Sequence, residues 1–395
     1  MIKTIINLRI LFLHNRYQQL GGEDVAVALE QELLKQKGHD VDLLFFENHF
    51  SGNGWGSIKR LGSFFYNTRS AKQLKSTIDK FKPDIVHVHN FFFTASPSIF
   101  YVCQKRRLPV VQTLHNFRLV CANALLMRDN KPCELCLTQK LPIHGFLYKC
   151  YRNSAFASAM VTAITGLYKI NGLWKNKIDK FITLTSFAQR KFLNSSLSLN
   201  DSQMVVKPNF TSDYGFGPLP RQHFYLFVGR ISTEKGIDVL VETFSQSKLP
   251  LILLGDGPER MRLEDKLKNQ TNIQFLGSKS KEEVIGFMKK AKALVFPSLW
   301  YEGMPYTIIE SFSTGTPVIA SYLGSMKELV VDGYNGFHFE TGNTESLLQV
   351  LLRFENEGNG ALYTNARNTY LEKYTPDEHY SKIIKIYEEV IGIKK

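Results

Sequence analysis

Short apolar runs alternate with helical patterns along all 395 residues, and this alternation constrains the fold more than any other feature of the sequence. It is typical of parallel sheets covered by helices on both faces, because crossover helices connect parallel strands. The first half predicts strands at residues 9–14, 41–46, 84–89, 109–114, 180–184 and 203–206. The second half predicts strands at residues 224–228, 250–254, 273–276, 293–297 and 317–320. The sequence therefore predicts an α/β protein with two doubly wound parallel sheets.

A proline- and glycine-rich stretch separates the two series of strands. It contains Pro208, Gly215, Gly217, Pro218 and Pro220, residue types that favour loops. The chain is also too long for one ordinary core. We predict a first domain at residues 1–208, a linker at 209–222, a second domain at 223–376 and a closing amphipathic helix at 377–395. Because wound sheets bind ligands at the carboxyl ends of their strands, we expect the two domains to face a cleft.

The positive charge of the protein lies in its first half. Residues 1–220 hold 28 Lys and Arg against 14 Asp and Glu, a net +14, whereas residues 221–395 hold 21 against 22, a net −1. Basic and aromatic residues alternate at 55–66 and 146–177. This pattern suits an anionic membrane or an anionic acceptor, and it is also compatible with a solvated basic surface. No nucleic-acid-binding signature accompanies the charge, so we expect no nucleic acid partner.

The apolar runs are too short for membrane spans. None approaches the roughly 20 residues that a spanning helix needs. Arg9 interrupts the N-terminal apolar run, and no small-residue cleavage site follows it. We expect a cytoplasmic protein that can lie peripherally on the inner face of the membrane.

Glu302 and Glu310 surround a predicted helix N-terminus in the second half. Pro305 fits the first helical position, which places Glu302 in the preceding loop and Glu310 inside the helix. The amides of Gly303 and Met304 would face the loop and form an anion site for a diphosphate. Two glutamates at this spacing can equally be surface charges, so the rest of the chain must decide between these interpretations.

Two cations follow the first strand of the second half. Arg230 ends that strand and Lys235 precedes the next helix, so both can point at one anion and offset the charge of a leaving diphosphate. Gly255, Asp256 and Gly257 follow the next strand and suit either a nucleotide-side turn or a plain turn. The chain lacks a Gly-x-Gly-x-x-Gly motif there, which disfavours oxidoreductase chemistry.

Two features of the first half lie after predicted strands. Gly21 and Gly22 precede a helix that we expect to begin near Glu23 and to end at Gly38, so exposed amides at Gly22 could approach a phosphate or an acceptor. His115 follows the strand at 109–114 and could hydrogen-bond a sugar hydroxyl, although a lone histidine is more often structural.

Four of the five cysteines cluster in an insertion at about residues 118–152. They are Cys121, Cys133, Cys136 and Cys150. A C-x2-C pair with two flanking thiols could form a tetrahedral zinc site that holds this strand-poor segment, and the alternatives are buried thiols or redox chemistry. Less than about half an equivalent of zinc per purified chain would contradict the zinc site.

The ordered set of motifs resembles glycosyltransferase family 4, also described as glycosyl transferases group 1. The set comprises Gly21-Gly22-Glu23, Asp84-Ile85-Val86-His87-Val88-His89, His115, Gly229-Arg230 with Lys235, and the stretch from Glu302 to Glu310. The resemblance spans about residues 8 to 390 and implies the GT-B architecture, two Rossmann-like domains around an interdomain cleft. It implies that the first domain binds the acceptor and the second binds a nucleoside-diphosphate sugar.

The resemblance also implies roles for single residues. Arg230 and Lys235 would bind the donor diphosphate and Glu310 the ribose. Glu302 and His115 would act at the sugar, with the backbone of Gly22, Gly303 and Met304 beside the donor. The family often has Asp after the histidine, where this chain has Asn116, which leaves an acidic role there in doubt.

The implied reaction is transfer of a sugar from a nucleoside-diphosphate sugar to a hydroxyl, with retention at the anomeric carbon. The motif set and the basic, aromatic first half together favour a lipid-linked glycan of cell-surface polysaccharide synthesis as acceptor. No cofactor is required for catalysis if cations and helix amides stabilise the leaving group. We favour transfer on one face of the sugar, since no carboxylate is clearly placed as a nucleophile. The alternatives are a nucleotide-sugar epimerase of the same architecture and a non-catalytic nucleotide- or glycan-binding protein.

Overall fold

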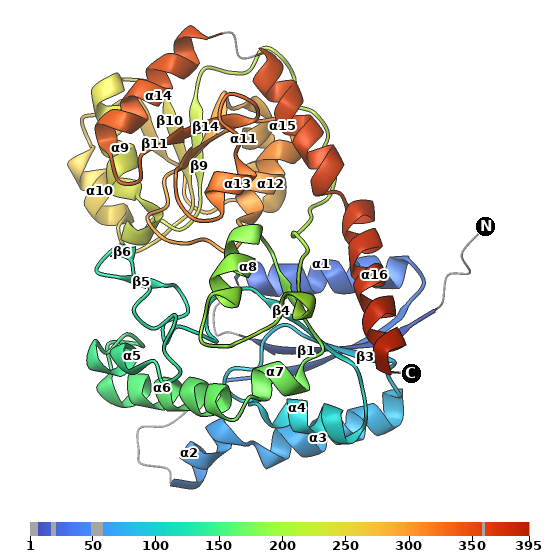
Figure 1. The fold of residues 1–395 in the computed structure, drawn as a ribbon. Helices are drawn as coiled ribbons and strands as arrows, with labels where there is room; N and C mark the ends of the chain where they lie inside the picture. The colour runs from blue at the N-terminus through green and yellow to red at the C-terminus, as the bar shows by residue number, and fades with distance from the viewer. Residues whose placement is uncertain (1–6, 17–20, 49–57, 358–359, 395) are drawn as a thin grey trace. The chain divides into compact units, whose positions relative to one another are not determined.

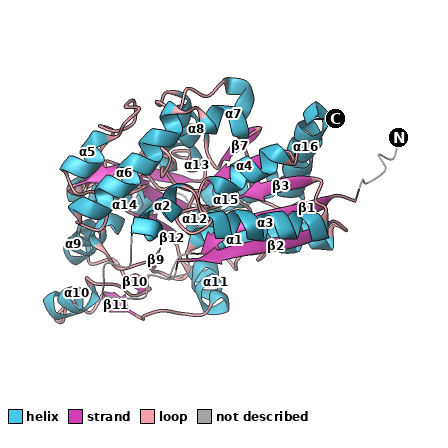
Figure 2. Ribbon diagram, turned by 90° about the horizontal axis from the view of Figure 1, so that it is seen from below, coloured by secondary structure: helices cyan, strands magenta, loops and turns pink. Residues whose placement is uncertain are grey.

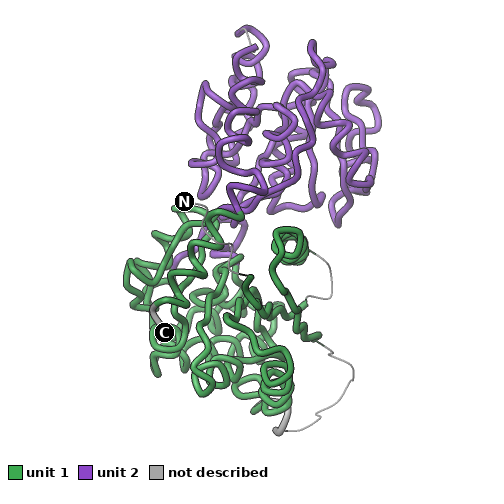
Figure 3. The backbone as a smooth tube through the Cα atoms, turned by 90° about the vertical axis from the view of Figure 1, so that its right-hand side faces the viewer, with its two compact units in different colours: residues 1–124, 135–207, 380–395 green, residues 125–134, 208–379 purple. Residues whose placement is uncertain are grey.

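The computed structural model describes residues 7–16, 21–48, 58–357 and 360–394, and the chain divides into two compact units (Figure 3). Unit 1 comprises Met1–Ala124, Leu135–Lys207 and Tyr380–Lys395. Unit 2 comprises Leu125–Glu134 and Pro208–His379. Each unit is built on its own parallel sheet with helices packed on it (Figure 2).

Unit 1 contains a six-stranded parallel sheet in the order β2-β1-β3-β4-β7-β8. Its strands are β1 (Arg9–Arg16), β2 (Asp40–Glu47), β3 (Ile85–Val88), β4 (Val110–Leu114), β7 (Lys180–Thr183) and β8 (Met204–Val206). Its helical segments are α1 (Gly22–Gln36), α2 (Ile58–Phe65), α3 (Thr68–Phe81), α4 (Ser98–Lys105), α5 (Ile143–Leu147), α6 (Ala155–Ile170), α7 (Leu173–Lys177), α8 (Ser186–Leu193) and η1 (Asp201–Gln203). The strand order reverses between β1 and β3, where Ile10 pairs with both Val41 and Ile85. Strands β1, β3 and β4 of this sheet are labelled in Figure 1.

Unit 2 contains a second six-stranded parallel sheet in the order β11-β10-β9-β12-β13-β14. Its strands are β9 (Tyr225–Val228), β10 (Leu251–Leu254), β11 (Ile273–Phe275), β12 (Ala293–Phe296), β13 (Val318–Ser321) and β14 (Gly336–Phe339), with a separate hairpin of β5 (Met127–Arg128) and β6 (Lys131–Pro132). Its helical segments are η2 (Thr233–Lys235), α9 (Ile237–Ser247), α10 (Arg260–Lys266), α11 (Lys281–Lys290), α12 (Tyr306–Ser313), α13 (Met326–Leu329), α14 (Thr344–Asn356) and α15 (Gly360–Lys373). The last helix, α16 (Pro376–Lys394), begins in unit 2 and continues in unit 1.

The predicted fold class is confirmed, because every predicted strand is part of one of two parallel sheets. The sequence did not predict β14, whose four residues include a glycine and a histidine. A Cβ atom at Gly336 would lie 1.9 Å from the carbonyl oxygen of Val318, so only glycine allows this approach to β13. Pro305 is the N-cap of α12, not its first helical residue, because its ψ of 126° is extended.

The segment predicted as a linker is attached to unit 2. The amide of Gly217 and the Nη2 of Arg221 both donate to the carbonyl oxygen of Thr314, each at 2.9 Å. The amide of Gln222 donates to the carbonyl oxygen of Lys290 at 2.8 Å. A segment rich in Pro and Gly is irregular, but it need not be loosely attached.

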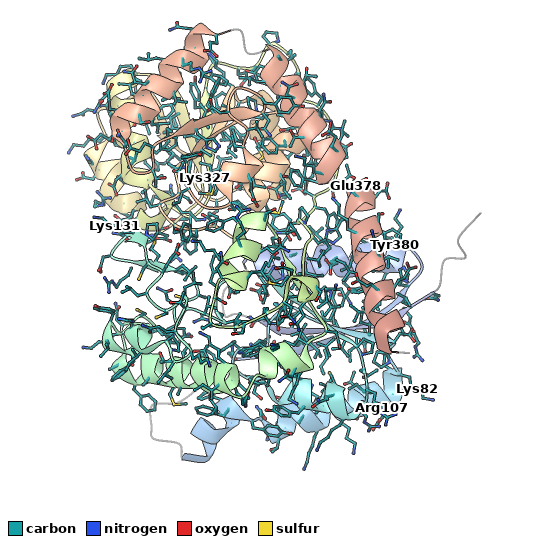
Figure 4. The ribbon with its side chains drawn as sticks, viewed as in Figure 1. Lys82, Arg107, Lys131, Lys327, Glu378 and Tyr380 are labelled. Atoms are coloured by element: carbon teal, nitrogen blue, oxygen red, sulfur yellow. The ribbon has the colours of Figure 1, made fainter. Side chains whose placement is uncertain are left out.

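The C-terminal helix completes the core of unit 1. Ile383, Ile386, Tyr387 and Val390 of α16 belong to the same buried cluster as residues of β1, β2, β3, β4, β7 and α1. Tyr380, which is labelled on α16 in Figure 4, exchanges a 2.9 Å hydrogen bond with His39. One face of this sheet is therefore covered partly by the last residues of the chain.

Buried polar groups connect α16, α1 and the end of β8. The Nζ of Lys207 donates to Oε2 of Glu30 at 2.7 Å, and both side chains are almost fully buried. His87 lies 3.2 Å from Oε1 of Glu30 and is hydrogen-bonded to Tyr387 at 2.7 Å and to Thr113 at 2.8 Å. Burial lowers the pKa of Lys207, while Glu30 opposes this shift by charge and hydrogen bonding. Each charge in this network is tolerated because the other one is present.

We predict that Lys207→Met destabilises unit 1 by roughly 3–5 kcal/mol, because it leaves the Glu30 carboxylate buried without its cation. Urea unfolding followed by circular dichroism measures this change. Glu389→Gln is the matched control, since it removes a pair with Lys180 in which the Glu389 side chain is 50% exposed, and it should cost at most about 1 kcal/mol. A double variant with Glu30→Gln should recover part of the loss, and equal effects of Lys207→Met and Glu389→Gln would contradict this account.

Candidate active site

The loops that follow β9 and β12 meet at the point where the strand order of unit 2 reverses. Open parallel sheets bind ligands at such a point, outside the carboxyl ends of the strands. Gly236, with φ of +72°, brings the two loops together, because a Cβ atom there would lie 1.9 Å from the carbonyl oxygen of Pro297. Lys235 is thereby placed beside the loop of residues 298–305, called here the donor loop.

Glu302 is the centre of the hydrogen bonding in the donor loop. Its Oε1 accepts from Nζ of Lys235 at 2.7 Å and from Ser298 and Trp300 at 2.6 Å each. Ser325 donates to the carbonyl oxygen of Glu302 at 2.8 Å, and Glu302 is 8% exposed. The carboxylate is therefore fixed in place, and an ammonium with three donors keeps others for a second anion. The sequence did not identify Ser298, Trp300 or Ser325, whose residue types carry no signal by themselves.

Arg230 and the amides predicted to bind a diphosphate lie in the same two loops. Arg230 follows β9 and is exposed, and within the described part of the chain it forms no ion pair. Gly303 and Met304 precede α12, and neither backbone N–H donates to another described protein group. Met304 itself is anchored, since the amide of Asn209 lies 3.1 Å from its sulfur. The roles of these residues in binding stay predictions.

The Gly255-Asp256-Gly257 turn packs directly on the loop after β9. A Cβ atom at Gly255 would lie 1.9 Å from the carbonyl oxygen of Gly229, and one at Gly257 would lie 2.2 Å from that of Ile231. Both glycines are therefore required for the close approach of two backbones, and this explains them without a ligand. Asp256 binds the amide of Gly257 at 2.7 Å and Arg260 at 3.3 Å, as in a turn.

Glu310 lies within α12, as predicted, and it is 4% exposed. It forms an ion pair with Lys281, the first residue of α11. The sequence did not identify Lys281, because a lysine at a helix start resembles any surface residue. A ribose hydroxyl that binds Glu310 would share this carboxylate with Lys281.

His115 of unit 1 lies directly after β4 and contacts another histidine. Its Nε2 is 3.1 Å from Nδ1 of His89, and both residues line a pocket formed by residues 89–92, 112–116, 118 and 119. Burial lowers the pKa of His115 to about 3, so its ring is neutral at physiological pH. A neutral imidazole can exchange hydrogen bonds with a hydroxyl but carries no charge for an anion. Its predicted contact with the sugar stays a prediction.

Acidic side chains at the start of α1 form a cluster that the sequence did not single out. His14 at the end of β1 is bonded to Asp24 at 2.9 Å and lies 3.8 Å from Glu23. Asn116 donates to Glu23 at 3.3 Å. Burial, followed by the charge of Asp24, raises the pKa of Glu23 to about 8. Gly22, the first residue of α1, is exposed beside this cluster.

Among the described residues, the one group whose ligand atoms are spaced for a metal ion is Glu30, His87 and His89. The Lys207 ammonium already neutralises Glu30, so charge balance needs no ion there. The four predicted zinc ligands are all described and form no such group. The thiols of Cys121, Cys136 and Cys150 instead lie against oxygens of Asn123, Pro142 and His144. Zinc stays a prediction.

In comparisons with known proteins, each half of the chain matches a glycosyltransferase family model. Residues 216–370 match the family model described as Glycosyl transferases group 1, and residues 21–166 match the one described as Glycosyltransferase Family 4. An uncharacterized glycosyltransferase of Methanocaldococcus jannaschii is 26% identical over 297 residues, which cover 73% of this chain and 78% of that protein.

Two further similarities come from proteins with a stated activity or ligand. The UDP-Gal:alpha-D-GlcNAc-diphosphoundecaprenol alpha-1,3-galactosyltransferase of Escherichia coli is 22% identical over 320 residues, covering 74% of this chain and 79% of the enzyme. The Anabaena protein HepE, solved in complex with UDP and glucose, superposes with a TM-score of 0.65 at 16% identity, covering 96% of this chain and 99% of HepE. At that identity the structural match shows a shared fold.

The shifted pKa values of Glu23 and His115 predict opposite dependences of stability on pH. Below about pH 6.5, His115 binds a proton in the unfolded protein but stays neutral in the folded protein. Acidification from pH 7 to 5 should therefore lower the free energy of unfolding by up to about 2 kcal/mol through this residue. Folded Glu23 keeps a proton that the unfolded state has lost, so its effect destabilises the protein as the pH rises from 4.5 to 8.

Thermal unfolding at pH 5, 7 and 8 tests both dependences. Relative to the wild type, His115→Gln should raise the Tm at pH 5 compared with that at pH 7, and Glu23→Gln should raise the Tm at pH 8 compared with that at pH 5. Glu32→Gln, on the exposed face of the same helix, is the control and should follow the wild type. Parallel curves for all four proteins would contradict the two pKa shifts.

Proposed function

Because the chain belongs to glycosyltransferase family 4, we propose that it transfers a sugar from a nucleoside-diphosphate donor to a hydroxyl acceptor with retention at the anomeric carbon. The protein is a glycosyltransferase of the GT-B fold class, with two parallel-sheet α/β units. The nucleotide-sugar donor, the retention and the acceptor are the proposed parts. HepE, which binds UDP and glucose, supports a nucleotide donor.

The observation that carries the proposal is the contact between Lys235 and Glu302 at the point where the strand order of unit 2 reverses. It places a cation and a fixed carboxylate where parallel sheets bind ligands. Arg230, exposed in the adjacent loop, adds a guanidinium suited to phosphate oxygens. These groups provide what a diphosphate leaving group needs, positive charge on one side and a polar contact for the sugar on the other.

The proposed reaction breaks the bond between the anomeric carbon and the diphosphate while the acceptor hydroxyl forms a new bond on the same face. The hydroxyl proton passes to the departing phosphate, so no protein base is required. Lys235 and Arg230 stabilise the diphosphate as it gains charge. Glu302 holds Lys235 and orients the sugar, and three hydrogen bonds to its Oε1 disfavour its action as a nucleophile. Catalysis through these residues needs no metal, and structural zinc at the cysteines is a separate proposal.

We also propose that the protein acts at an anionic membrane surface, with a lipid-linked glycan as acceptor. The galactosyltransferase of Escherichia coli described above acts on a diphosphoundecaprenol-linked sugar. No helix among the described residues is long and apolar enough to cross a bilayer.

An apolar surface on α5, α6 and their flanks fits this role; it is called here the α5–α6 surface. Its exposed large apolar residues are Leu141, Ile143, Phe146, Leu147, Tyr148, Phe156, Leu167 and Ile170. Along α6, Phe156, Met160, Ala163, Leu167 and Ile170 recur at helical spacing and are at least partly exposed. A helix with such a stripe suits the interface of a bilayer.

The charges near the α5–α6 surface favour lipid over a protein partner of mixed charge. Residues 135–178 contain six Lys and Arg and no Asp or Glu. Lys140, Lys149, Arg152 and Lys175 are exposed. Basic side chains around an exposed apolar stripe are attracted to anionic headgroups. Of the other basic and aromatic segment, 55–66, the part from Trp55 to Ser57 lies outside the described residues, as do the side chains of residues 58–61.

We predict that Lys235→Ala raises the KM for the donor about 10- to 100-fold, because one charge-assisted contact to the diphosphate is lost. Glu302→Gln should lower kcat more than it raises KM. A panel of nucleotide sugars, with the product linkage determined by NMR, identifies the donor for these measurements. Lys279→Ala, whose exposed ammonium pairs with Glu283 at 3.3 Å, is the control.

Three results, one from the variants and two from the donor panel, would contradict the proposal in whole or in part. Unchanged kinetics in both site variants would remove the assigned roles. Conversion of a donor without acceptor, with an inverted ring carbon, would indicate an epimerase. Binding of a donor without turnover on any acceptor would indicate a non-catalytic protein.

We predict that the protein co-sediments with vesicles containing phosphatidylglycerol at low salt and that Phe156→Ser with Ile170→Ser weakens this binding at least about tenfold, since each side chain loses its burial in lipid. Met261→Ser is the control, because Met261 is 83% exposed but lies in unit 2. Absence of binding at low salt would refute the membrane proposal. If light scattering shows that the protein is a dimer and that Phe156→Ser with Ile170→Ser disrupts it, the surface would instead bind a second copy of the chain.

A further inference from the structure

A short hairpin from the first half of the chain belongs to unit 2. Residues Leu125–Glu134 group with unit 2, although the chain before and after them groups with unit 1 (Figure 3). Strands β5 and β6 pair antiparallel, and Asp129 and Asn130 form the turn that joins them. Both turn residues have positive φ, as in a type I′ turn. The amide of Cys133 donates to the carbonyl oxygen of Leu126 at 2.7 Å and closes the base of the hairpin. Lys131 of β6 is labelled in Figure 4.

The end of this hairpin is bonded to the donor loop. The hydroxyl of Tyr301 donates to Oε1 of Glu134 at 2.8 Å, across 167 residues of sequence. Burial, the hydrogen bond and the charge of Glu134 together raise the pKa of Tyr301, so the phenol stays protonated and continues to donate. Glu134 lies inside the Cys133–Cys136 motif, which the reaction proposed above leaves unexplained.

Tyr301 occupies a position through which the hairpin can influence the donor loop. Its neighbours are Trp300, which donates to Glu302, and Glu302 itself. The ammonium of Lys235 also lies 5.3 Å from the Trp300 ring. A constraint on the Tyr301 side chain therefore limits the movement of the backbone between Trp300 and Glu302. Both of these residues help to set the position of the Glu302 carboxylate.

We infer that Glu134 is a positioning residue for the donor loop, which it holds through Tyr301. The hydrogen bond restricts residues 300–302 and so fixes the Glu302 carboxylate relative to Lys235. Its effect on turnover rests on the proposed function, whereas its effect on the loop does not. The hairpin thus contributes to the donor site of unit 2, although it lies among residues of unit 1 in the sequence.

Fluorescence quenching tests the inference without any substrate. In a Trp55→Phe background, Trp300 is the partly exposed tryptophan, whereas Trp174 is 1% exposed. We expect Tyr301→Phe and Glu134→Ala each to increase quenching of Trp300 by acrylamide. Asp129→Asn is the matched control, because it removes a carboxylate charge from the same hairpin at a side chain that is 84% exposed, and Asn tolerates the positive φ of the turn. Quenching that is equal in all variants would overturn the inference.

Kinetics with the donor identified in the panel separate positioning from simple packing. Tyr301→Phe and Glu134→Ala should each lower kcat about 3- to 10-fold, as for one lost hydrogen bond, with a smaller change in KM. The double variant should resemble either single one, because both remove the same bond. Glu134→Gln keeps an acceptor and should restore most of the rate. Additive losses, or losses equal to that of Asp129→Asn, would contradict the inference.

If the protein transfers no sugar, the proposed function fails while the quenching result still decides whether Glu134 holds the loop. If turnover is normal and quenching is unchanged, the proposed function stands and this inference fails. The Tm of each variant confirms that the fold is intact, and the conservative Tyr301→Phe change keeps the test decisive even if Glu134→Ala unfolds the hairpin.

Discussion

In a parallel sheet all strands end at one edge, and the reversal of strand order between β9 and β12 decides which loops meet there. This reversal brings Lys235 to Glu302, although 67 residues separate them in the sequence. Gly236 then permits a contact with Pro297 that no side chain would allow. The donor loop, the fixed carboxylate and the adjacent cations all depend on this arrangement. The proposed contacts of these residues with a diphosphate rest on this position of the two loops.

Unit 1 differs from the donor loop in that it buries charged and ionisable side chains. Lys207 and Glu30 are stable inside the protein because each compensates the other, and His87 connects them to Tyr387 of the last helix. Burial also keeps His115 neutral and Glu23 protonated near neutral pH. Unit 1 therefore contains neutral hydrogen-bonding groups of the kind that can bind an uncharged hydroxyl. Unit 2 contains cations of the kind that can bind a diphosphate.

The sequence predicted the strands well because a buried parallel strand is a local apolar run that needs no knowledge of its neighbours. It also placed Glu302 in a loop and Glu310 in a helix from residue types alone. It did not predict β14 or the β5–β6 hairpin, because four-residue and two-residue strands carry too little pattern. Nor did it identify Lys281, Ser298 or Tyr301 as partners of site residues, since a common polar residue becomes informative only when its contact is known.

The sequence by itself determined the fold class, the strand positions, the uneven charge and the motifs that indicate glycosyltransferase family 4. These are properties of residue order and spacing, which need no distances. The tertiary structure decided that Glu302 is held by Lys235, that Glu310 pairs with Lys281, and that the hairpin containing Glu134 belongs to unit 2. Such contacts join residues far apart in the chain, and only strand order and packing set the distances between their atoms.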